Sequence, residues 1–186
     1  VHLLQTVLPG YIANTLLLMI LVGVMTMALG VGSAWLVVTF RFPGQRILSW
    51  ALVLPLAMPG YIIAYVYTDL LEFAGPVQTL LRSATGWGAQ DYSFPPIRSL
   101  GGASLMLSLV LYPYVYLLTR TSFQRQSVAL VEATRVLGVT PARAFLKVAL
   151  PCARPAIAGG VALALMETIS DYGVADYFGI STLTAG

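Results

Sequence analysis

The pattern of hydrophobic and polar positions along the chain is dominated by long apolar runs without charge. No charged residue stands between residues 3 and 40, and residues 11–40 alone would form about 45 Å of helix. Further uncharged runs cover residues 47–68 and 100–119, and a fourth apolar run begins at Ala156. Since the hydrocarbon core of a bilayer is about 30 Å thick, this pattern predicts four membrane-spanning helices.

Two of these spans carry residues that interrupt a simple helix. Pro55 and Pro59 stand in the segment LPLAMPGYIIAY, where each removes a helical hydrogen bond, so a broken or bent helix is expected. Glu167, Asp171 and Asp176 interrupt the far half of the fourth run, so the pattern leaves its outer boundary undefined.

Composition excludes a water-soluble domain. Of the 186 residues, 58% are hydrophobic and 9% are charged, whereas soluble domains contain about 25% charged residues. The chain is therefore expected to be an all-α integral membrane protein, whose helices satisfy their backbone hydrogen bonds internally. With one cysteine, Cys152, and one histidine, His2, the sequence offers no disulfide within the chain and no cluster of metal ligands.

Basic residues in the connections predict the orientation of the spans. Residues 41–46 hold two arginines and residues 120–155 hold six Arg and Lys residues, whereas residues 69–99 hold two arginines. Arg and Lys accumulate on the cytoplasmic side of short connections. Residues 41–46 and 120–155 are therefore expected to be cytoplasmic and residues 69–99 external, with both chain ends outside.

The external segment contains three aromatic residues, Trp87, Tyr92 and Phe94, and no long apolar run. It is expected to form a loop with a short interfacial helix. The aromatic side chains would either rest at the lipid headgroups or contact a soluble partner outside the membrane.

The connection of residues 120–155 is polar and is expected to form two short helices on the cytoplasmic face. Ser127 is a suitable N-cap for a first helix, and Gly138 suits the left-handed position that ends it. Thr140 would cap a second helix with Pro141 as its first residue, and Pro151 is expected to stop that helix.

Within this connection the stretch VEATRVLGVTPARAFLKVALP resembles the EAA loop of permease subunits in binding-protein-dependent ABC importers. The pattern of that loop is EAA, three residues, Gly, nine residues and I-x-L-P, and both spacings match. Thr134 departs from it in place of Ala, and Val148 departs from it in place of Ile. Both changes are conservative in volume.

The resemblance implies a multi-span helical bundle whose cytoplasmic coupling helices sit in a groove of an ABC ATPase dimer. The chain would then be a single transmembrane permease domain over residues 1–186, with the coupling loop at 120–155, and a truncated half of a longer chain. The positions carried over as ATPase-coupling residues are Glu132, Ala133, Thr134, Gly138, Leu150 and Pro151. Further implied partners are an external, periplasmic solute-binding protein and a second permease half, either fused or an identical copy, in a bacterial inner membrane.

ATP hydrolysis is expected to belong to a partner. The phosphate-binding motif G-x-x-x-x-G-K-[ST] does not occur, so no cofactor and no catalytic residue is assigned to this chain. Gly159 and Gly160 are expected to allow close helix packing instead. Two other classes of membrane protein are alternatives. An intramembrane enzyme would need a nucleophile with a base, or a metal cluster, in its spans. A passive channel or membrane scaffold would have no function for the coupling loop.

The segments LPLAMPGYIIAYVYTDLLEFAGP and ALMETISDYGVADYFG are similar to permeases of the ferric iron transport group. Ferric iron is therefore the implied solute, and hard oxygen ligands such as carboxylates and tyrosines suit it chemically. Thiamine, a polyamine or an oxyanion such as sulfate or molybdate are alternatives, because the same loop serves importers of all of them.

Four residues of the last span are candidates for the outer part of the translocation path or its gate: Glu167, Ser170, Asp171 and Tyr172. Glu167 and Asp171 are four residues apart and are expected to share one helical face, about 17 and 23 Å from the inner surface. Carboxylates at such depth usually face a bundle interior or a cavity. Alternatively, they hydrogen-bond neighbouring helices or lie in a short outer re-entrant segment.

Overall fold

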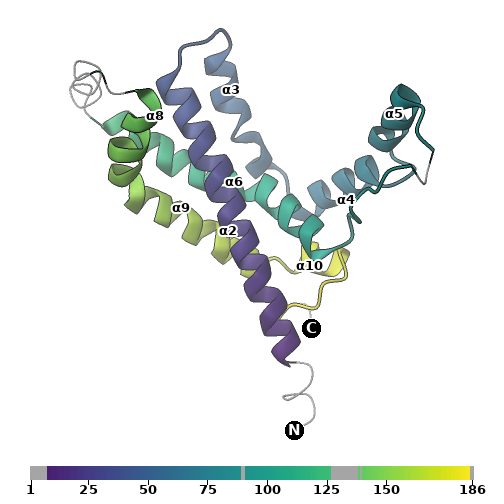
Figure 1. Cartoon of the computed structure of the whole chain (residues 1–186). Coiled ribbons are helices and arrows are strands. Elements are labelled where there is room, and N and C mark those ends of the chain that lie inside the picture. The colour runs from purple at the N-terminus through teal and green to yellow at the C-terminus, as the bar shows by residue number, and fades with distance from the viewer. Residues whose placement is uncertain (1–7, 89–90, 127–137, 139, 185–186) are drawn as a thin grey trace. The chain divides into compact units, whose positions relative to one another are not determined.

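The computed structural model describes residues 8–88, 91–126, 138 and 140–184, and every element in these ranges is a helix. The predicted all-α class is confirmed. The elements are α2 (Leu8–Thr39), α3 (Gln45–Ala51), the 3₁₀ turn η1 (Leu54–Ala57), α4 (Gly60–Leu71), α5 (Pro76–Thr85), α6 (Leu100–Arg125), α8 (Pro141–Ala144), the π turn η2 (Phe145–Ala149), α9 (Leu150–Ser170) and α10 (Tyr172–Tyr177) (Figure 1).

Three helices in the described part are long and apolar enough to cross a membrane: α2, α6 and the helix from Ala142 to Ser170. The second predicted span is broken, as its prolines indicated, because α3 ends at Ala51 and α4 begins only after Pro59. Its two parts qualify as a span only when they are taken together. Pro59 is the N-cap of α4, a position where the missing N–H leaves no helical hydrogen bond unmade.

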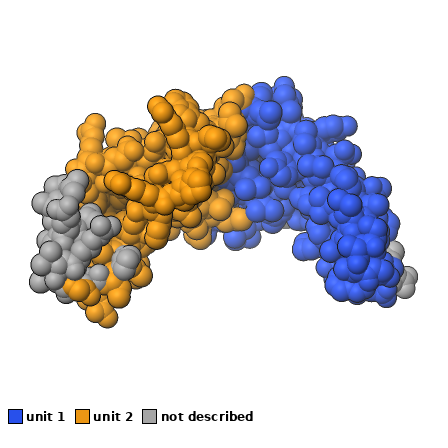
Figure 2. All heavy atoms as spheres, turned by 90° about the horizontal axis from the view of Figure 1, so that it is seen from above, with its two compact units in different colours: residues 1–22, 58–110, 168–186 blue, residues 23–57, 111–167 orange. Residues whose placement is uncertain are grey.

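The chain forms two compact units, coloured blue and orange in Figure 2. The first comprises residues 1–22, 58–110 and 168–186, and the second comprises residues 23–57 and 111–167.

The second unit has a hydrophobic core made by α2, α6 and the start of α9. Tyr116, fully buried on α6, donates a hydrogen bond of 3.1 Å to the carbonyl oxygen of Ser49, which fastens α3 to this core. The core residues are Val31, Ala34, Val37, Val115, Tyr116, Phe123, Ala149, Ala153 and Ile157.

Two glycines let neighbouring helices approach α6 at backbone distance in this unit. A Cβ on Gly30 of α2 would lie 2.6 Å from the Cβ of Val115. A Cβ on Gly160 of α9 would lie 2.6 Å from the Cα of the same Val115. Neither distance leaves room for a side chain, so both contacts require glycine. The expected close packing is confirmed for Gly160. At Gly159 an added Cβ would meet only the Leu118 side chain, at 3.7 Å.

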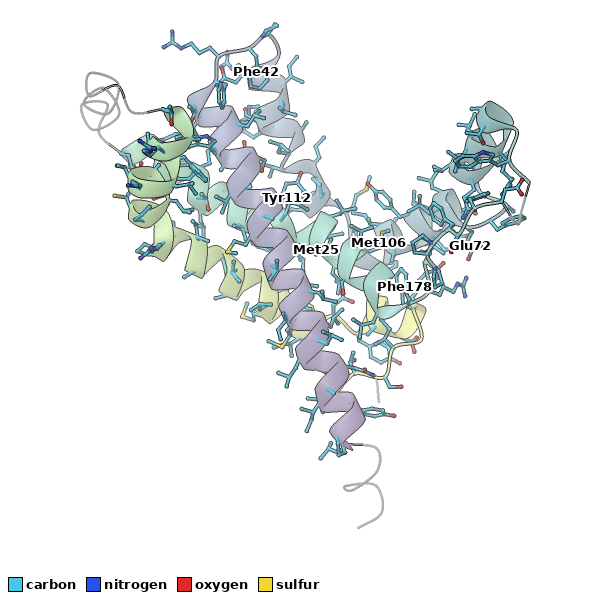
Figure 3. All side chains as sticks on the ribbon, in the orientation of Figure 1. Met25, Phe42, Glu72, Met106, Tyr112 and Phe178 are labelled. Atoms are coloured by element: carbon cyan, nitrogen blue, oxygen red, sulfur yellow. The ribbon has the colours of Figure 1, made fainter. Side chains whose placement is uncertain are left out.

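In the first unit the short helix α10 packs against α4, and the chain after α10 returns to α2. The Asn14 side chain donates to the carbonyl oxygen of Ser181 at 3.2 Å, and the backbone N–H of Leu183 donates to the Thr15 hydroxyl at 3.1 Å. Phe178 is buried at the end of α10 (Figure 3). These contacts hold the segment after α10 against the first turns of α2.

The prediction that Pro151 stops a helix is wrong, because the helix continues from Ala142 to Ser170. The π turn η2 immediately precedes the proline, and the Leu150 N–H donates to the carbonyl oxygen of Phe145, five residues back. A wider turn gives space to the proline ring, which in a regular α-helix would press on the carbonyl four residues earlier.

Candidate functional site

Part of the predicted coupling loop lies outside the described residues. Glu132, Ala133 and Thr134, together with the proposed cap Ser127, fall in this part, and their coupling role stays a prediction. Gly138 and the segment from residue 140 onward are described.

Gly138 has the backbone conformation that its place in the motif requires. Its φ is +67°, in the left-handed region that side chains disfavour, and a Cβ built on it would meet nothing within 4 Å. A side chain at this position is therefore disfavoured by the backbone conformation and not by neighbouring atoms. After Thr140 the helix α8 begins at Pro141, as predicted, and the Ala144 N–H donates to the Thr140 carbonyl oxygen at 2.9 Å.

A side-chain hydrogen bond joins the two ends of the coupling loop. The Gln126 amide, just beyond the end of α6, donates to the carbonyl oxygen of Ala149 in η2 at 3.0 Å, across 23 positions of sequence. Leu150 and Pro151, which close the motif, follow directly as the first residues of α9. Both ends of the loop are therefore fixed at one place on the helices.

Three aromatic rings from three elements pack beside this hydrogen bond. The ring of Trp35 on α2 lies 5.6 Å from that of Phe123 on α6 and 4.6 Å from that of Phe145 in η2, centroid to centroid. The Phe123 and Phe145 rings are 6.3 Å apart. We call these rings, with Gln126 and Ala149, the loop base. Sequence reasoning missed it, because nothing in the local pattern links Trp35 to residues 88 and 110 positions later.

Two of the candidate path residues belong to α9 and two lie beyond its end. Glu167 and Ser170 lie on the last turns of α9, but Asp171 follows the helix end with φ −79° and ψ 101°. It is the N-cap of α10, where its Oδ1 accepts a hydrogen bond of 2.7 Å from the Val174 N–H. Aspartate satisfies free N–H groups at a helix start, and this use of its side chain ends α9. Tyr172 is the exposed first residue of α10.

Asp171 lies in a narrow, hydroxyl-rich part of the first unit. The hollow beside it has a volume of about 10 Å³. Four threonines are among the residues that line it: Thr15, Thr168, Thr182 and Thr184. A volume of this size holds about one water molecule. A Cβ on Gly60, at the start of α4, would lie 3.0 Å from Asp171 Oδ2, so a larger residue there would have to displace this carboxylate slightly.

Residues 26–185, most of the chain, match the family described as "Binding-protein-dependent transport system inner membrane component". The chain belongs to this family. Members are permease subunits of binding-protein-dependent importers and not enzymes, so the resemblance of the loop is confirmed at this level, although it does not single out the ferric iron group. A permease with helices of this length and hydropathy is an integral membrane protein.

Curated relatives of this permease are named for several solutes. The probable sulfate transport system permease protein cysT of Nephroselmis olivacea is 33% identical over 144 residues, 75% of this chain and 46% of the relative. The molybdenum transport system permease protein ModB of Escherichia coli K12 is 29% identical over 144 residues, 77% of this chain and 60% of the relative. The Fe(3+)-transport system permease protein FbpB 2 of Haemophilus influenzae is 24% identical over 173 residues, 93% of this chain and 30% of the relative. The chain spans about half the length of the first two.

Proposed function

We propose that this permease forms half of the membrane pathway of an ABC importer. It would accept a solute from an external binding protein and release it into the cytoplasm of a bacterium. A partner ATPase dimer would contact the loop of residues 120–155 and would supply the hydrolysis, and a second permease half, fused or an identical copy, would complete the path. In this orientation residues 41–46 are also cytoplasmic and residues 69–99 external.

The loop base is the observation that carries this proposal. Because Gln126 holds the two ends of the loop together and Trp35 packs on both Phe123 and Phe145, a displacement of the loop is passed to α2, α6 and α9 at once. Packed elements of this kind move as rigid bodies. Closure of an ATPase pair on the loop would therefore move three helices together, which is what a coupling loop must achieve.

For the solute we propose a small oxyanion. Relatives at 33% and 29% identity are named for sulfate and molybdenum, and one at 25% identity for 2-aminoethylphosphonate. The use of Asp171 as a helix cap is compatible with an anionic solute. Such a solute is repelled by a carboxylate and does not need one as a ligand. Ferric iron is the second candidate, because the relative named for Fe(3+) matches 93% of the chain. Thiamine and a polyamine are further alternatives for the solute, because the coupling loop is the same in importers of all these solutes.

We retain the outer path or gate as the proposed location of Glu167, Ser170, Asp171 and Tyr172. Glu167, Ser170 and Tyr172 are exposed on the single chain, where a second permease half could face them. Asp171 would then contribute by placing α10 and not as a ligand.

The test is ATP hydrolysis by the full-length protein with its ATPase in proteoliposomes. Binding proteins loaded with sulfate, molybdate or ferric iron are added in turn, with the empty proteins as the reference. We expect stimulation by an oxyanion-loaded protein, and its loss in Gly138→Leu. Gly44→Leu is the matched control, since Gly44 also has a positive φ, of +85°, and also has nothing within 4 Å of an added Cβ.

The outcomes separate the parts of the proposal. Stimulation only by the ferric-loaded protein would replace the oxyanion by iron and keep the importer. Equal stimulation in wild type and Gly138→Leu would remove the coupling role of the loop. A Gly44→Leu variant that loses stimulation as well would show that backbone strain alone explains the loss.

A further inference from the structure

The short helix α5, in the segment between α4 and α6, carries its apolar side chains on the outside. Leu80 is 68% exposed, Val77 41% and Leu81 36%, whereas the polar Gln78 is only 4% exposed. At 3.6 residues per turn these apolar residues and Ala84 occupy an arc of about 100° around the helix. The distribution is the reverse of that of a helix on a water-soluble protein.

A polar network holds the other face of α5 against its own segment. The Tyr92 hydroxyl donates to Gln78 Oε1 at 2.8 Å and accepts from the Arg82 guanidinium at 3.0 Å. Gln78 also donates to the Leu71 carbonyl oxygen at 2.7 Å, and Arg82 to that of Phe73 at 2.8 Å. These bonds fasten Tyr92 to α5, and its ring lies 6.1 Å from that of Trp87, centroid to centroid, so its predicted place at the headgroups stays a prediction.

The hydroxyl side chains of α5 are paired inside the segment as well. Ser83 and Thr85 donate to carbonyl oxygens of the preceding turn at 2.9 and 2.7 Å, and Thr79 accepts from Arg82 at 3.2 Å. Each hydrogen-bonding side chain of α5 thus has a partner that is not water. Water makes such pairing unnecessary, whereas an environment with few donors and acceptors requires it.

We propose that α5 lies in the bilayer interface, with Val77, Leu80, Leu81 and Ala84 facing the lipid acyl chains. The inference rests on the chain being an integral membrane protein and is independent of the solute. Four residues separate α4 from α5, so the start of α5 can stand at most about 17 Å from the end of α4. Trp87, 48% exposed just after the helix, has the side chain most typical of the headgroup level.

Lipid fits this face better than a soluble partner that comes and goes. The exposed apolar surface of α5 follows that of α4, a helix that belongs to the bent candidate span, on which Ile62, Tyr65 and Val66 are exposed. A face reserved for a transient partner would leave Leu80 in water between encounters, at a cost proportional to its exposed apolar area. The acyl chains of a bilayer cover such a face permanently.

The test uses single cysteines in a Cys152→Ser background of the full-length protein, reconstituted in phosphatidylcholine vesicles whose acyl chains are brominated near the headgroup. A bimane label is attached at Leu80→Cys or Val77→Cys, and at Thr79→Cys as the matched control, an exposed position about 160° from Val77 and about 100° from Leu80 around the same helix. We expect bimane fluorescence to be quenched several-fold more at the first two positions than at Thr79→Cys. Addition of loaded binding protein should leave this difference unchanged.

Two results would overturn the inference. Equal quenching at Leu80→Cys, Val77→Cys and Thr79→Cys would show that this face of α5 does not prefer lipid. Labels that become shielded only when the binding protein is added would assign the face to that soluble partner. Since quenching needs no transport, either result leaves the proposed importer function to be judged by ATP hydrolysis alone.

Discussion

Replacing Gly160 by alanine tests whether α6 and α9 contact each other through their backbones. The added Cβ would lie 2.6 Å from the Val115 Cα and 3.2 Å from the Tyr114 carbonyl oxygen. The first distance is about 1 Å short of ordinary carbon–carbon contact. Main-chain atoms cannot rotate away as a side chain can, so the helices must separate locally. Overpacking of this kind costs about 1–3 kcal/mol.

Gly159→Ala is the matched control, because both substitutions give α9 the same gain in helix propensity. That gain, about 1 kcal/mol relative to glycine, is unopposed at Gly159, where the added Cβ meets only a side-chain methyl group at 3.7 Å. The propensity gain cancels in the difference between the two variants. We therefore expect Gly160→Ala to be less stable than Gly159→Ala by about 1–3 kcal/mol.

The difference can be measured by titration with sodium dodecyl sulfate in mixed micelles, with loss of helical circular dichroism as the signal. Both variants should keep the same helical content before the transition, so that only the midpoint and slope are compared. Free energies of unfolding that agree within about 0.5 kcal/mol would refute the backbone contact between α6 and α9.

Three further predictions use the same measurement together with transport. Asp171→Ala should lower the free energy of unfolding by about 1 kcal/mol through loss of the α10 cap, whereas Asp171→Asn, which can still accept from the Val174 N–H, should keep most of it; equal loss in both would argue against a cap. Phe123→Ala should cost about 3–5 kcal/mol because this ring is buried in the loop base, and Phe123→Leu should cost less; ATP hydrolysis stimulated by loaded binding protein should fall in the same order. The ion pair of Glu72 and Arg98, 3.3 Å long and exposed on both sides, should contribute less than about 1 kcal/mol, so that neither Glu72→Arg nor Arg98→Glu alone shifts the unfolding midpoint strongly.

The spans could be predicted because bilayer thickness imposes a length that few other structures share. The uncharged run from residue 100 begins where α6 begins, and Pro59 marks the start of α4. The left-handed conformation of Gly138 was predictable for a similar reason, since glycine adopts a positive φ without steric cost. In each case one local property of the sequence determines the structure.

Other features depend on contacts that local patterns do not contain. Pro151 was expected to end a helix because the pattern does not reveal a π turn in front of it. Spacing alone treats Asp171 as a continuation of the helix that carries Glu167, although aspartate is also a strong N-cap, and that signal is present in the sequence. The hydrogen bond from Tyr92 to Gln78 and the ring of Trp35 beside Phe145 depend on residues distant along the chain.

The π turn η2 also makes the direction of the coupling loop depend on the number of residues in the chain. Such a turn accommodates one residue more than an α-helical turn, and one residue corresponds to about 100° of rotation around a helix. Deleting a single residue between Phe145 and Ala149 would convert η2 into a regular α-helical turn and leave α8 facing nearly as it does now, because the π turn already takes up the additional residue. Deleting a residue elsewhere in this helix, with η2 retained, would instead turn α8 about the axis of α9 by that angle and present a different face of the loop, even if every contact residue were identical.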